Sequence, residues 1–114
     1  MDLYYKSTRN SNLKVTASEA ILKGLAPDGG LFVPEKLPVL GKSMEELKDL
    51  NYQDTAYEVM KCFLTDFTEE ELRNCIEKAY DSKFDDEAIA PLVKVEDTYY
   101  LELFHGATIA FKDM

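Results

Sequence analysis

The stretch Leu101–Met114, LELFHGATIAFKDM, decides how the carboxyl-terminal part of this chain folds. Its first residues continue an apolar-rich run from the two tyrosines before it, which is typical of a β-strand. The run breaks at Gly106, because glycine supplies the backbone freedom that a sharp change from strand to loop requires. Lys112 and Asp113 are predicted to begin a helix, since a carboxylate in a first turn interacts favourably with the helix dipole.

The residues just before this stretch predict a β-hairpin. The segments 92–95 (LVKV) and 99–103 (YYLEL) are rich in alternating apolar residues and flank the short polar turn 96–98 (EDT). The hairpin presents residues 105–112 as its trailing loop. If its surface is meant to contact further polypeptide, an apolar patch is expected beside it.

Lys112 is the candidate catalytic residue of this loop. It lies between Phe111 and Asp113 in the sequence. An amine held near apolar surface and a helix N-terminus has its charged form disfavoured. Such an amine acts as a nucleophile toward carbonyl compounds.

Three capping boxes of the Ser/Thr-x-x-Glu type predict helix starts, at Thr16–Glu19, Ser43–Glu46 and Thr68–Glu71. The first helix is expected to run for about eight residues to Gly24, a favourable residue just after a helix. The second is expected to end near Leu50. Each prediction rests on local hydrogen bonding, so it needs no knowledge of the tertiary fold.

Asn51 is predicted to begin a longer helix, which pairs in antiparallel fashion with the helix after Thr68. Residues 83–90 are predicted to be a polar link, whose acidic centre 85–87 is either solvated or a divalent-cation site. The apolar stripes of the two helices are interpreted as core; they are Ala56, Val59, Met60, Phe63, Leu64 and Phe67, and then Leu72, Cys75, Ile76, Ala79 and Tyr80.

Length and composition exclude several classes of protein. The chain has 114 residues, 46% hydrophobic and 31% charged, which indicates one soluble globular domain at most. Its net charge of -9 disfavours nucleic acid and anionic membrane surfaces as partners. A signal peptide and a membrane-spanning stretch are absent, so we expect a cytoplasmic protein. With one histidine and no CxxC pair, no metal site is expected, and Cys62 and Cys75 are predicted to be free, part-buried thiols.

The last segment resembles the pyridoxal-phosphate lysine motif of threonine synthase, usually written ELFHGPTLAFKD. The residues that match it in order and spacing are Glu102, Leu103, Phe104, His105, Gly106, Thr108, Ala110, Phe111, Lys112 and Asp113. The family carries its cofactor as a Schiff base on the motif lysine, which maps onto Lys112. Two residues depart from the motif: Ala107 replaces proline, which leaves the loop less preordered, and Ile109 replaces leucine, a change that is close in volume.

Two earlier segments carry the same resemblance. Residues 4–10 are similar to the family's Tyr-x-Ser-Thr-Arg-Gly opening, with Asn10 in place of a glycine and therefore a candidate for positive φ. Residues 19–35 are similar to the amino-terminal signature of the family. Within them, residues 28–30 (DGG) either line the cofactor cleft or form a tight turn after Pro27.

The resemblance implies the amino-terminal part of a longer enzyme of the second pyridoxal-phosphate fold type, with an α+β fold of amphipathic helices packed on a short sheet or hairpin. Residues 1–91 would be the amino-terminal domain, and residues 92–114 the hairpin and the start of the lysine segment of a catalytic domain that is otherwise missing. The implied reaction converts O-phospho-L-homoserine and water to L-threonine and phosphate. The fragment by itself is expected to be inactive. The alternative is a stand-alone acidic interaction module without catalytic activity.

The resemblance also assigns roles to particular side chains. Lys112 would bind pyridoxal 5'-phosphate and act as general acid and base. Phe111 would pack beside the cofactor ring, or be ordinary core. Thr108 would bind a substrate phosphate or carboxylate, or cap the loop. His105 would support the substrate site, or be a structural histidine, and Arg9 would bind a phosphate, or form a structural ion pair.

Overall fold

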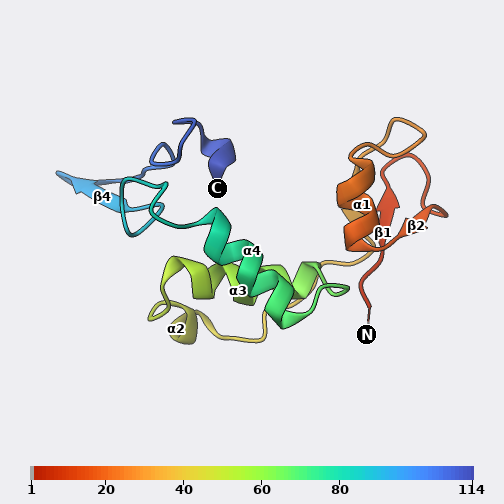
Figure 1. The fold of residues 1–114 in the computed structure, drawn as a ribbon, viewed down its shortest axis with the longest axis horizontal. Coiled ribbons are helices and arrows are strands. Elements are labelled where there is room, and N and C mark those ends of the chain that lie inside the picture. The colour runs from red at the N-terminus through yellow and green to blue at the C-terminus, as the bar shows by residue number, and fades with distance from the viewer. Residues whose placement is uncertain (1) are drawn as a thin grey trace.

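A three-stranded sheet and one helix form the amino-terminal unit of the computed structural model, which describes residues 2–114. The strands are β1 (Tyr5–Ser7), β2 (Lys14–Val15) and β3 (Phe32–Pro34), in the order β2-β1-β3 with both neighbours antiparallel. Helix α1 (Ala17–Lys23) packs beside this sheet (Figure 1).

The first capping box is formed as predicted. The Thr16 hydroxyl accepts a hydrogen bond from the Glu19 N–H, and the Glu19 carboxylate accepts one from the Thr16 N–H at 2.9 Å. The helix stops at Gly24, which has φ of 70°. Glycine tolerates this value because it has no Cβ to clash with the backbone.

Residues 26–30 form a tight turn and not an open loop. The Gly29 N–H donates to the Ala26 carbonyl at 2.8 Å, and the Ala26 N–H donates to the Gly30 carbonyl at 2.9 Å. Pro27 fits the second position of such a turn, and Gly29, which follows the two central residues, has a positive φ of 79°. The predicted tight turn is therefore confirmed, and a place of residues 28–30 in the cofactor cleft stays a prediction.

Helices make the middle of the molecule: α2 (Met44–Leu47), α3 (Tyr52–Phe63) and α4 (Glu69–Ala79). The predicted caps are all present, because the side chains of Ser43, Asn51 and Thr68 each accept a hydrogen bond from the backbone N–H three residues later. Helix α2 is shorter than expected: it ends at Leu47, and a single turn brings the chain to the next cap.

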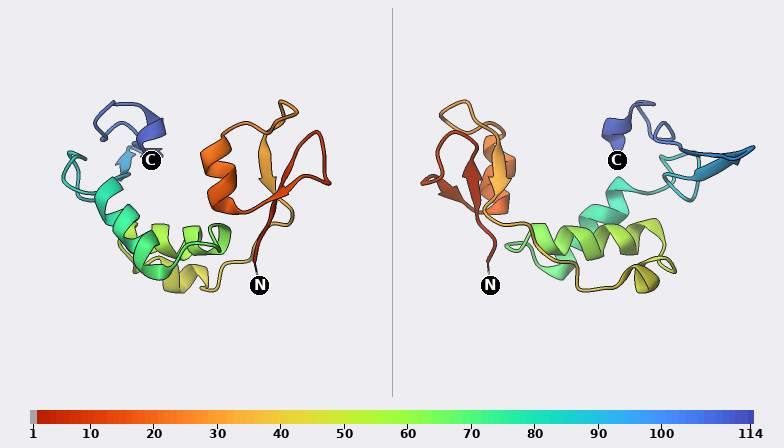
Figure 2. Two further views of the ribbon diagram at one scale, coloured as in Figure 1. Left: turned by 45° about the vertical axis from the view of Figure 1, so that its right-hand side comes forward. Right: turned by 180° about the vertical axis from the view of Figure 1, so that it is seen from behind.

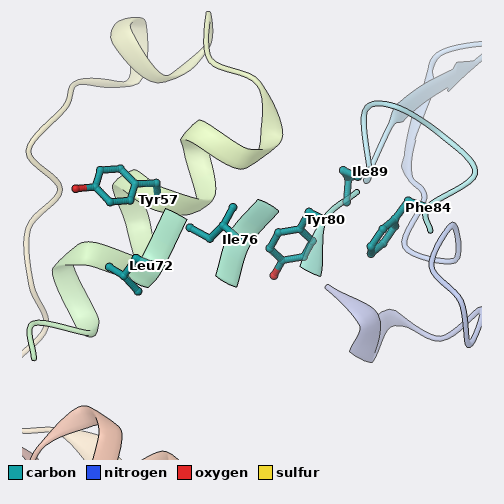
Figure 3. Close-up of a cluster of buried hydrophobic side chains, with 6 residues drawn as sticks. All are labelled: Tyr57, Leu72, Ile76, Tyr80, Phe84 and Ile89. Atoms are coloured by element: carbon teal, nitrogen blue, oxygen red, sulfur yellow. The ribbon is translucent and has the colours of Figure 1, made fainter. Parts of the chain in front are cut away.

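The core lies between α3 and α4 and continues into the segment that follows them (Figure 3). Phe84 and Ile89 are buried, so the prediction that residues 83–90 are a polar link is wrong for its apolar members. The acidic residues between them face outward, and two aromatic pairs join Tyr80 to Tyr52 and to Phe84. The buried cluster consists of Tyr57, Leu72, Ile76, Tyr80, Phe84 and Ile89.

The predicted hairpin is present as β4 (Leu92–Val95) and β5 (Thr98–Leu101), with Val93 opposite Tyr100. Its residues are exposed on both faces, and apolar side chains occupy both. The α+β class is confirmed. The structure has two separate sheets, with the helical pair between the amino-terminal sheet and the hairpin, where one sheet was expected (Figures 1 and 2).

The two thiols differ from each other. Cys62 is half-buried and Cys75 is exposed, so the predicted part burial of Cys75 is wrong. It lies one position from Ile76 on α4, which turns it away from the face that packs on α3. Within residues 2–114, no group of three or more His, Cys, Asp or Glu side chains is placed to hold a metal ion. Among these same residues, no helix combines the length and apolar content needed to cross a membrane.

Candidate functional site

The loop after the hairpin is closed by Asp113. Its carboxylate accepts hydrogen bonds from the Thr108 N–H at 2.8 Å and from the Thr108 hydroxyl at 2.7 Å. The Ile109 N–H donates to the Gly106 carbonyl at 3.1 Å, which forms a turn inside the loop. Thr108 thus caps the loop in this structure, the second of the two roles that the sequence allowed.

Gly106 is needed for a different reason from the one predicted. Its φ is not in the left-handed region, so backbone freedom is not the constraint. It is buried, and a Cβ built on it would lie 2.5 Å from the Cβ and Oδ2 of Asp113. The absence of a side chain lets the Asp113 carboxylate pack directly on the loop backbone.

Ile109 departs from expectation as well. Its φ is 63°, in the left-handed region, where a β-branched side chain is an unusual occupant. The comparison of leucine with isoleucine by volume alone overlooked this backbone conformation. Because Ile109 is 73% exposed, burial within the described residues does not offset the cost.

Lys112 lies in a single 3-10 turn, η1 (Phe111–Asp113), and is exposed. Among residues 2–114 its amine has no ion-pair or hydrogen-bond partner. Phe111 beside it is 65% exposed. The described residues therefore do not supply the apolar surroundings predicted for this amine. They do supply a free amine and an aromatic ring next to it.

Met114 anchors the end of the segment that follows Lys112. Its side chain packs against the buried cluster of the helices, and the Tyr52 hydroxyl lies 3.9 Å from its sulfur. The lysine turn is held between the Asp113 contacts and this apolar contact. Sequence reasoning missed Met114, because the sequence carries no signal that pairs it with a residue 62 positions away.

His105 lies between two carboxylates. Its Nε2 is 2.9 Å from Glu102 Oε2, and its Nδ1 pairs with Asp85 Oδ1. The hydrogen bond to Glu102, and next the one to Asp85, raise the pKa of His105 above its ordinary value of 6.5. The Phe104 ring is 4.6 Å from the imidazole, centre to centre. Asp85 was not predicted as a partner, because the sequence separates it from His105 by 20 residues.

Arg9 belongs to the amino-terminal unit and not to the lysine loop. Its Nη1 donates to the Asp28 carbonyl at 3.0 Å. The buried Ser7 hydroxyl donates to the Asp28 carboxylate at 2.7 Å, and with the Gly30 N–H it lowers the pKa of Asp28. In Figures 1 and 2 the loop between β1 and β2, which carries Arg9, lies on a different unit from the end of the chain.

Asn10, next to Arg9, does not take a positive φ, so that part of the prediction is wrong. Its Oδ1 accepts a hydrogen bond from the Asn12 N–H at 3.0 Å. This is the local turn that an asparagine side chain stabilises in place of a glycine.

Of the predicted site residues, His105, Thr108, Phe111 and Lys112 all lie within one loop, and Arg9 lies apart from them.

Comparison with known proteins places this geometry in a family. The model of the threonine synthase N terminus matches residues 4–80. The chain belongs to the threonine synthase family. The threonine synthase of Eremothecium gossypii is 42% identical over 124 residues, covering 100% of this chain and 24% of that protein.

Solved threonine synthases share the fold as well. The crystal structure of threonine synthase from yeast superposes with a TM-score of 0.87 at 35% identity, over 96% of this chain and 23% of that one. The PLP-bound threonine synthase from Brucella melitensis gives a TM-score of 0.84 at 34% identity, over 97% and 24%. The chain therefore spans about a quarter of the length of the threonine synthases it matches.

Proposed function

We propose that this chain is the amino-terminal part of a pyridoxal-phosphate-dependent threonine synthase, and that Lys112 holds the cofactor. The whole enzyme would convert O-phospho-L-homoserine and water to L-threonine and phosphate, as a carbon–oxygen lyase acting on a phosphate. The observation that carries the proposal is an exposed, unpaired lysine on a tied loop, in a chain of the threonine synthase family.

The residues present fit covalent attachment of an aldehyde cofactor at this position. The Lys112 amine is open to solvent, and the residues on either side are fixed by Thr108–Asp113 hydrogen bonds and by the packing of Met114. The ring of Phe111 is exposed beside the amine and offers an apolar surface to a planar ring. The described residues contain no Gly-rich phosphate-binding loop beside Lys112, so the phosphate group would be bound by the longer protein.

The chemistry divides between cofactor and chain. When bound, pyridoxal phosphate is the electron sink that lets protons leave the carbon atoms of an amino-acid substrate. Lys112 would tether it and, once displaced by the substrate amine, take and return protons at Cα and then at Cβ. Thr108 and His105 would orient the loop that carries the lysine, and Arg9, with one guanidinium nitrogen on Asp28, has donors left for an anion.

The exposed hairpin supports the proposal that this chain is part of a longer protein. Apolar residues on both faces of β4 and β5 are typical of strands that are covered on both sides. The apolar patch expected near the hairpin is present on the hairpin itself, and we assign it to contact with the rest of the catalytic domain. With two unpaired cysteines and a net charge of -9, we place the enzyme in the cytoplasm, acting on a small molecule and not on nucleic acid or membrane.

Borohydride reduction of the complete gene product with pyridoxal phosphate tests the proposal. We expect mass spectrometry to find the reduced cofactor on Lys112. Lys112→Ala should lose the label and release phosphate from O-phosphohomoserine about 10²–10⁴-fold more slowly. Lys78→Ala, which removes an exposed lysine of α4 away from the hairpin and the lysine loop, is the matched control and should keep both. A label on another lysine, or full turnover by Lys112→Ala, would refute the assignment; the 114-residue chain alone should release no phosphate.

A further inference from the structure

The His105 cluster joins two parts of the chain that are far apart in sequence. Glu102 follows strand β5, and its N–H donates to the Pro91 carbonyl at 3.0 Å, so it belongs to the hairpin. Asp85 lies in the segment after α4, and its N–H donates to the His105 carbonyl at 3.1 Å. The His105 side chain, only 13% exposed, lies between the two carboxylates.

With both carboxylates ionised, the geometry favours a proton on each ring nitrogen. An ionised carboxylate only accepts hydrogen bonds, and a neutral imidazole has one N–H and one bare nitrogen. With Glu102 at Nε2 and Asp85 at Nδ1, a neutral ring would set its bare nitrogen against a carboxylate oxygen. The imidazolium donates to both, and the raised pKa of His105 has the same cause.

Both ends of this contact are anchored. Asp85 follows Phe84 and precedes Ile89, and both apolar side chains are buried in the helical core (Figure 3). On the other side, His105 is followed by Gly106, on which the Asp113 side chain packs. The two carboxylates are the charged groups that face the ring, and Asp113 is the next acidic group along the loop; among the described residues no cation pairs with the ring.

We propose that His105 is a positioning residue whose doubly protonated ring ties the lysine loop, and with it Lys112, to the core-anchored segment 84–89. The role toward the cofactor rests on the proposed function. Loss of one proton replaces an attractive contact with a repulsive one, so the loop loosens toward alkaline pH and the cofactor is held less tightly. The ring touches neither cofactor nor substrate in this role.

The sign of the pH dependence follows from the raised pKa. The folded protein binds the His105 proton more tightly than the unfolded chain does, so the contribution to stability is complete below pH 6.5, the ordinary pKa. It is lost as the pH rises through the raised pKa. Cofactor retention should fall over the same interval.

Glu102→Gln in the complete protein separates this role from a merely structural one. A glutamine amide can accept from a ring N–H or donate to a bare nitrogen, so it pairs with either protonation state of His105. We would measure the melting temperature without cofactor, and the pyridoxal phosphate retained after dialysis, from about pH 6 to about pH 9, which covers the ordinary histidine pKa and the region above it. Asp85→Asn is the second variant, and Glu77→Gln, on the exposed face of α4, is the control for the lost charge.

We expect the wild type and Glu77→Gln to lose melting temperature and cofactor together as the pH rises. In Glu102→Gln and Asp85→Asn the alkaline loss should be about half as large or less. A wild-type melting temperature that does not depend on pH here, or an unchanged loss in both amide variants, would overturn the proposal. If Lys112 is never labelled by borohydride, the proposed function fails, while the melting temperatures measured without cofactor still decide the role of His105.

Discussion

The helical pair and the hairpin use apolar residues in opposite ways. On α4, Leu72 and Ile76 lie on one face and are each 3% exposed. On β4, Leu92 and Val93 are neighbours that point to opposite faces, and both are exposed. The helices bury their apolar stripe within the described residues, whereas the hairpin carries more apolar surface than these residues can cover. Of these two regions, the helices therefore stabilise residues 2–114 by burying apolar surface, and the hairpin presents an exposed surface.

The largest expected effect tests this contrast directly. Ile76→Ala in the 114-residue chain should lower the free energy of unfolding by about 2–5 kcal/mol, because it leaves a cavity in the packed core. Leu92→Ala should change it by no more than about 0.5 kcal/mol, since the side chain is already in water. Urea unfolding followed by circular dichroism measures both. Equal losses in the two variants would show that the hairpin is covered in solution and would contradict the difference between the two regions.

A smaller effect is expected within the lysine loop. Gly106→Ala places a methyl group against the Asp113 side chain and should cost about 1–3 kcal/mol of unfolding free energy. Gly41→Ala is its matched control, because nothing lies within 4 Å of the added carbon and the φ is not positive. If thermal melting shows the same small change for both, the loop does not close on Asp113 as described.

The smallest effect is expected at Ala107, the residue after Gly106. Ala107→Pro should be neutral or stabilising by about 0.4–1 kcal/mol, because proline reduces the freedom of the unfolded chain. The Ala107 φ is not positive, and its N–H has no backbone partner among the described residues, so the ring removes no hydrogen bond. A clear fall in the melting temperature would show that the loop runs differently before Lys112.

Local features of the fold could be predicted from the sequence. The caps at Thr16, Ser43, Asn51 and Thr68 bond to a backbone group three residues later, so the residue types alone suffice to locate them. The turn at Pro27 follows from preferences of single residues for particular φ values, and the hairpin follows from the alternation of apolar residues around a short polar turn. The motif that ends at Asp113 predicted the family, which the match to residues 4–80 confirms, whereas the role of the lysine stays a prediction.

The errors concern contacts between distant residues. The sequence predicts a polar link for residues 83–90. Phe84 and Ile89 nevertheless complete the core, because they pack against the apolar surface at the ends of the helices. Gly106 appeared to serve backbone freedom, but its role is close approach to a side chain seven residues later. Neither effect is visible in local periodicity, which describes one element at a time.

The sequence by itself determined where the helices and the hairpin begin and which amine belongs to the family's lysine motif, since these depend on neighbours within a few residues. Only the tertiary structure decided that Asp85 faces His105, that Met114 packs on the helical core, and that the hairpin remains uncovered. These depend on where a packed backbone places side chains 20 to 62 positions apart. Such placement is set by the whole core and not by any single segment.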